Sequence, residues 1–157
     1  MKAFKRIFIG GVAVVIAIPI LFIIGLIAGP AVNDAKADKI EKAFQKLEMP
    51  AQTELVETVS FCGNTSGTGN HVEIWSGFLV KSELSKTELQ EWYMDAKIPD
   101  RTYEPMVWSV PEDLTMHYPE PHSFIHFAHF NGMTEAKGYY IIGGYFDAPT
   151  QMDLRGH

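Results

Sequence analysis

The chain has 157 residues, with 13 Lys and Arg against 19 Asp and Glu, a formal net charge of −6 and one cysteine, Cys62. The acidic balance argues against a nucleic-acid partner, because binding a phosphate backbone needs clustered positive charge. A lone cysteine excludes a disulfide within the chain and a cysteine-rich zinc site, and nothing else in the sequence calls for a cofactor.

The first element is an N-terminal apolar stretch. A basic head, residues 1–6, precedes residues 7–29, which are 23 residues without a charged side chain. A helix rises ~1.5 Å per residue, so this stretch is long enough to cross a hydrocarbon core of ~30 Å. The pattern predicts a transmembrane helix, residues 7–29, that has the lipid bilayer as its partner.

A cleavable secretory signal is the alternative to an anchor. The apolar centre of such a signal spans about 7 to 15 residues, and the cleavage site follows closely. The best match for a site, Ala35-Lys36-Ala37, lies well beyond the apolar end. The sequence therefore favours an uncleaved signal-anchor in the cell membrane. The compact basic head predicts that the N-terminus is cytoplasmic and that residues 30–157 form one extracytoplasmic domain.

Two glycines near the end of the span, Gly25 and Gly29, match the small-xxx-small motif that lets two membrane helices approach closely. A homodimer through this pair is one interpretation, and incidental small residues are the other. Pro30 follows directly and lacks a backbone donor, so the membrane helix is expected to end or kink there.

A second helix is expected from a cap at Asn33 or Asp34 to about Glu48, with one apolar face. Alternation then predicts strands over residues 53–62 and 71–81, paired as an antiparallel hairpin. In the first of these strands Leu55 should share a face with Val59 and Phe61, and Val56 should take the other face.

The tetrapeptide Ser85-Lys86-Thr87-Glu88 is a capping box that predicts the start of another helix, ending near Ile98-Pro99. Further strand candidates are residues 106–110, 123–130 and 139–146. This order predicts an α+β fold, in which an N-terminal transmembrane helix is followed by a small antiparallel sheet with about two helices on one face. The tail, residues 148–157, is expected to fray.

The loop between the paired strands carries the first candidate site. A thiol at Cys62 and an imidazole at His71 could act as nucleophile and base, and the residues between them could contact a ligand or a partner. As a plain turn, the loop glycines would only allow positive φ. The loop consists of Gly63, Asn64, Thr65, Ser66, Gly67, Thr68, Gly69 and Asn70.

Four histidines form the second candidate, namely His117, His122, His126 and His129. On a helix, the last three would share one face and could bind a zinc-like ion. The surrounding prolines and phenylalanines favour a strand, in which only His122 and His126 share a face. Two ligands rarely make a site, so no metal is predicted.

Two functions remain open from the sequence. The favoured one is a single-pass, membrane-anchored binding or interaction module outside the cytoplasm, with another membrane or envelope protein as a partner. The alternative is a small membrane-tethered thiol hydrolase that uses Cys62 and His71.

Overall fold

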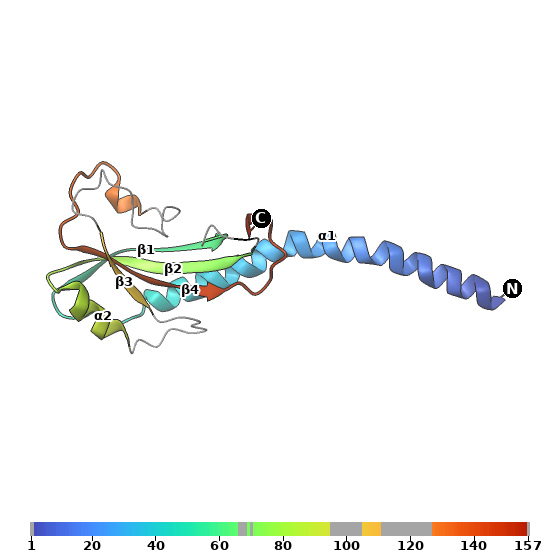
Figure 1. Ribbon diagram of the computed structural model, residues 1–157, viewed down its shortest axis with the longest axis horizontal. Helices are drawn as coiled ribbons and strands as arrows, with labels where there is room; N and C mark the ends of the chain where they lie inside the picture. Colours follow the sequence, from blue (N-terminus) through green and yellow to red (C-terminus); the bar gives the residue numbers. More distant parts are fainter. Residues whose placement is uncertain (1, 66–68, 70, 95–104, 111–126, 157) are drawn as a thin grey trace.

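A long N-terminal helix, a four-stranded sheet and a short second helix are the main elements of the described part of the chain (Figure 1). The computed structural model describes residues 2–65, 69, 71–94, 105–110 and 127–156. Its elements are α1 (Lys2–Phe44), β1 (Thr53–Gly63), β2 (Glu73–Ser82), α2 (Lys86–Met94), β3 (Met106–Ser109), β4 (Tyr139–Asp147) and two short 3-10 helices, η1 (Ala128–Phe130) and η2 (Leu154–Gly156).

The sheet is antiparallel throughout, in the order β1-β2-β4-β3. Its first face is covered by the C-terminal part of α1 and by α2, whose Phe44 and Tyr93 both contact Phe78 of β2 at ring-centroid distances of 5.5 Å. This arrangement confirms the predicted α+β fold with two helices on one face of the sheet. The buried core on this side consists of Ala37, Ile40, Phe44, Cys62, Val72, Ile74, Phe78, Val80, Leu89, Tyr93, Val107, Ile142 and Phe146.

The second face of the sheet buries a separate cluster under the chain segment that contains η1. Trp75 lies at its centre, fully buried. A Cβ at Gly77 or Gly143, which pair across β2 and β4, would lie 2.6 Å from the Trp75 ring. The two glycines therefore leave the space that the indole occupies.

α1 continues through Pro30 as a single helix, so the expected break and the second helix capped at Asn33 or Asp34 are wrong. A proline in a helix removes one backbone hydrogen bond. Here the following turns are held by packing, since Asn33, Ala37 and Ile40 are all buried. Tertiary contacts thus maintain a helix that local sequence alone would interrupt, and it ends at Phe44.

A bulge in β1 makes the predicted sides of Leu55 and Val56 wrong relative to Val59. The pairing with β2 shifts between Leu55 and Glu57, which inserts Val56 as an extra residue. Leu55 consequently packs with the helix-covered core, whereas Val56 and Val59 pack with the cluster around Trp75. One inserted residue reverses the alternation that a regular strand would keep.

The capping box at the start of α2 is confirmed. The Ser85 N–H donates to Glu88 Oε2 at 2.8 Å, and the Glu88 N–H donates to Ser85 Oγ at 3.3 Å. These bonds satisfy donors that the first turn leaves open. The predicted end near Ile98-Pro99 lies outside the described residues.

The strand candidates have different outcomes. β3 and β4 confirm the candidates at 106–110 and 139–146. The candidate at 123–130 is wrong at its end, where Ala128–Phe130 form η1, and its residues 123–126 lie outside the described part. Glu57 accounts for the turn, because its carboxylate accepts hydrogen bonds from the Ala128 and His129 amides at 3.0 and 2.8 Å.

The tail is packed instead of frayed. Residues 148–156 cross α1 where this helix leaves the sheet, and Asp153 and Gly156 are buried. The last residue, His157, lies outside the described residues. Polar side chains of the tail have partners on α1 and at the start of β2, which an alternation or helix pattern does not reveal.

Candidate functional site

The contact between the tail and α1 begins at the two glycines of the span. A Cβ at Gly25 would lie 2.5 Å from both Cε and Sδ of Met152, and a Cβ at Gly29 would collide with the Met152 carbonyl oxygen. Only glycine permits such an approach to a helix backbone. The small-xxx-small motif, for which a homodimer was one interpretation, is thus covered by Met152 of the same chain.

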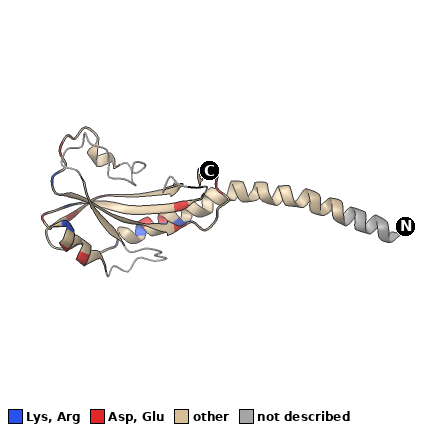
Figure 2. Cartoon of the chain, viewed as in Figure 1, with Lys and Arg blue, Asp and Glu red and all other residues tan. Residues whose placement is uncertain are grey.

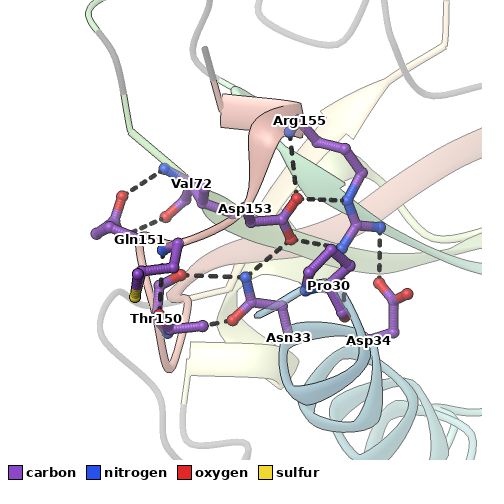
Figure 3. Close-up of polar contacts among 9 residues, drawn as sticks. Pro30, Asn33, Asp34, Val72, Thr150, Gln151, Asp153 and Arg155 are labelled. Atoms are coloured by element: carbon purple, nitrogen blue, oxygen red, sulfur yellow. Dashed lines mark hydrogen bonds and ion pairs between the residues drawn. The ribbon is translucent and has the colours of Figure 1, made fainter. Parts of the chain in front are cut away.

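Asn33 is the polar centre of this junction (Figure 3). It is fully buried on α1, and its side chain is bonded to the tail alone in the contacts drawn. The amide nitrogen donates to the Thr150 carbonyl at 3.1 Å and to Asp153 Oδ2 at 3.0 Å, while Oδ1 accepts from the Thr150 N–H at 3.2 Å. A buried side-chain amide needs hydrogen-bond partners, and the tail provides them for Asn33.

Asp153 and Arg155 bond to α1 at Pro30 and in the turn that follows it. Asp153 is fully buried, and Arg155 donates to its carboxylate through Nε at 2.9 Å and Nη2 at 2.6 Å. The hydrogen bond from Arg155 is the main cause that lowers the pKa of Asp153 to about 2. Arg155 also donates to Asp34 at 2.7 Å and to the Pro30 carbonyl at 3.3 Å. The same Asp153 bond raises the pKa of Arg155.

The tail is also tied to the sheet. Gln151 accepts a hydrogen bond from the Val72 N–H at 2.7 Å and donates to the Val72 carbonyl at 3.0 Å. The side-chain amide therefore pairs with both backbone groups of Val72, as a neighbouring strand would. The N–H of Asn64 donates to the Arg155 carbonyl at 3.1 Å. α1, the residue that precedes β2 and the candidate loop thus all contact residues 150–155.

Cys62 lies in the core that α1 covers, with 5% of its surface exposed. Burial raises the pKa of its thiol to about 11, and the Arg155 charge offsets only part of this effect. His71, at the other end of the loop, has its Nε2 3.1 Å from Oε1 of Glu73. Since the thiolate is the nucleophile, a buried thiol with a raised pKa is poorly suited to that role.

The described part of the candidate loop is a turn held by its own side chains. The Asn64 amide donates to the Gly69 carbonyl at 2.7 Å, and Thr65 Oγ1 donates to Glu73 Oε2 at 2.8 Å. Gly69 has a φ of 68°, which suits glycine. Ser66, Gly67, Thr68 and Asn70 lie outside the described residues.

Of the four candidate histidines, only His129 belongs to the described residues, and its Nε2 lies 3.0 Å from the Tyr139 hydroxyl. His117, His122 and His126 lie outside them. Within the described ranges there is no group of three His, Cys, Asp or Glu residues that could hold a metal ion.

A concave surface lies at the end of the sheet opposite to the contact between the tail and α1. At this end β1 and β4 begin and β2 ends. We call this concave surface the distal cleft. It is an open hollow of about 820 Å³ in which two lysines lie among acidic and hydroxyl side chains. No sequence motif indicates it, because its residues come from three separated segments. They are Gln52, Thr53, Glu54, Lys81, Ser82, Glu83, Lys137, Gly138 and Tyr140.

α1 is, in the described part of the chain, the one helix long and apolar enough to cross a membrane, by length and composition. In Figure 2 the described part of α1 that projects from the sheet is free of the colours for Lys, Arg, Asp and Glu, in agreement with the uncharged sequence of residues 11–29. No protein family, curated protein or solved structure matches the chain.

Proposed function

We propose that the protein is a single-pass, membrane-anchored binding module with a cytoplasmic N-terminus and its α+β domain outside the cytoplasm. The observation that carries this proposal is the continuity of α1. Its apolar residues 11–24 are exposed, and the same helix runs on into the buried core at Ala37, Ile40 and Phe44. An exposed all-round apolar helix is stable in lipid but not in water.

The packing of α1 supports an uncleaved anchor. In the Ala35-Lys36-Ala37 triplet, Ala37 is 6% exposed and lies inside the helix. Proteolysis needs local opening of the chain, which here would break core contacts. Removal of residues up to Ala37 would also take away Gly29 and Asn33, the two positions that receive the tail.

The contacts between the tail and α1 support a rigid attachment of the domain to the membrane helix. Arg155 and Asn33 bond the tail to α1 at Pro30 and in the turn that follows it, and no linker separates the span from the core. A domain held in this way presents its distal cleft away from the bilayer. The mixed charges of Lys81, Lys137, Glu54 and Glu83 suit a polar surface of another membrane or envelope protein.

Burial and the raised pKa of Cys62 oppose formation of the thiolate, which disfavours the thiol hydrolase. A binding role requires only the distal cleft and the rigid attachment of the domain to α1.

Photo-crosslinking in intact cells tests the binding role. A photoreactive residue replaces Glu83 in the distal cleft, and the matched control carries it at Glu91, an exposed glutamate of α2 outside the cleft. We expect a discrete adduct from position 83 that is lost with Lys137→Glu and is absent from position 91. No adduct at position 83, or the same adducts from both positions, would contradict the proposal.

A reporter enzyme that is active only outside the cytoplasm, fused after His157, tests the orientation. The proposal expects an active reporter in the membrane fraction. An inactive fusion at normal expression would contradict the orientation while leaving the binding role open to the crosslinking test.

A further inference from the structure

Leu154 is an exposed apolar side chain at the end of the domain from which α1 projects. It is 66% exposed, more than any other large apolar residue outside α1 among the described residues. It opens η2, directly after the buried Asp153. A single exposed leucine is ordinary on a protein surface, so its position relative to the span decides its meaning.

The depth of the tail follows from the contacts of Met152. Residues 7–29 form a helix of about 35 Å at ~1.5 Å per residue, slightly longer than a ~30 Å hydrocarbon core. The hydrocarbon boundary on the domain side therefore falls within the last turn before Pro30. Met152 reaches this depth, because its side chain lies against Gly25 and its backbone against Gly29.

Residues next to Met152 must then lie in the interfacial layer of headgroups, which is about 5–8 Å thick on each side of the bilayer. Val32, 49% exposed, is three residues beyond Gly29, or about 4.5 Å along the helix. Asn33 holds Thr150 and Asp153 beside it. Polar Asp34 and Arg155, joined at 2.7 Å, lie at the same level, where charged groups remain hydrated.

We propose that the tail turn, residues 152–154, is seated in the interfacial layer of the bilayer, with Leu154 as its apolar contact. This inference rests on the proposed membrane anchor. A single helix leaves a domain free to tilt and to rotate about the helix axis. A second contact with lipid beside the helix restrains both motions and fixes the direction in which the distal cleft faces.

Fluorescence quenching in proteoliposomes of phosphatidylcholine tests the contact, with the full-length chain as the only protein. Leu154→Cys carries an environment-sensitive dye, and the lipids carry a nitroxide quencher either near the headgroup or deep in the acyl chain. Ile18→Cys marks the centre of the span, and Glu83→Cys marks the distal cleft. The wild-type chain is the labelling blank, because Cys62 is buried.

We expect quenching at position 154 mainly by the shallow nitroxide, quenching at position 18 mainly by the deep one, and none at position 83. Val32→Cys provides a second reporter of the same layer that leaves the tail unaltered, and it should behave as position 154 does. Quenching at position 18 with none at position 154 overturns this inference alone. Absence of quenching at position 18 overturns the anchor itself.

Discussion

Substitution of Gly29 by alanine tests the contact that joins the tail to the anchor. In a helix interior, alanine is favoured over glycine by ~1 kcal/mol. At Gly29, however, the new Cβ collides with the Met152 carbonyl oxygen and lies 2.8 Å from the Met152 carbonyl carbon. Both atoms are backbone, so the tail must move. Overpacking of this kind costs ~1–3 kcal/mol, which outweighs the gain in helix propensity.

The expected consequence is local opening of the tail, measured by hydrogen exchange in detergent or lipid. The Thr150 amide reports the bond to Asn33, and the Val72 amide reports the bond to Gln151. An overpacking cost of ~2 kcal/mol less a propensity gain of ~1 kcal/mol leaves a net loss of ~1 kcal/mol in local stability, which corresponds to exchange about 5-fold faster at both amides, with the sheet amides unchanged.

Gly11→Ala is the matched control, because a Cβ at Gly11 meets no atom within 4 Å. It should leave the protection of Thr150 and Val72 as in the wild type. Unchanged protection in Gly29→Ala, or equal loss in both variants, would refute the close approach of Met152 to the helix.

Three more predictions concern Asp153, Cys62 and Ser85. The pKa of Asp153 is lowered to about 2 from 3.8, so its carboxylate stabilises the fold above its ordinary pKa, and this contribution is lost as the pH falls through about 2. Asp153→Asn should therefore lower the melting temperature near neutral pH, and its difference from the wild type should shrink on acidification; a difference independent of pH would count against the ion pair. Burial raises the pKa of Cys62 to about 11, so a maleimide should label the unfolded chain but not the folded one, and stoichiometric labelling of native protein would reopen the thiol hydrolase. Ser85→Ala should reduce the free energy of unfolding in urea by ~1 kcal/mol through loss of the cap of α2, whereas an unchanged midpoint would show that the capping box is dispensable.

The features that could be predicted from the sequence are those that depend on neighbouring residues. The capping box needs only Ser85 and Glu88, and the alternation of Ile74, Phe78 and Val80 needs only the pleat of one strand. These signals were sufficient to place β2, β4 and the start of α2, and to give the fold class.

The features that were missed depend on contacts far apart in the chain. Pro30 alone predicts that the helix ends or kinks. The helix continues because Asn33 and Ala37, in the turns that follow, are buried against the tail and the sheet, and these partners are distant in sequence. The bulge at Val56 has no glycine or other local signal. The packed tail depends on Asn33 meeting Asp153 across 120 positions of sequence, a pairing that no single-sequence pattern contains.

The candidate site shows the same division. The glycines between Cys62 and His71 predict a loop, and its described part forms a turn through Asn64 and Gly69. The burial of the thiol could not be inferred from the strand pattern alone, because the residues that alternate with it on the same face, Thr58 and Ser60, are polar, although α1 covers this face. No sequence pattern predicts the distal cleft, because its polar residues are far apart in the chain and meet only in the fold.

The intact mass of the protein recovered from the membrane fraction tests the central claim most directly, since an unbroken anchor must remain part of the folded domain. We predict a membrane-bound species with the mass of the whole chain, 17.6 kDa. A soluble species that begins after Ala37 would contradict the account, because it would lack both the span and the Gly29 and Asn33 contacts that hold the tail.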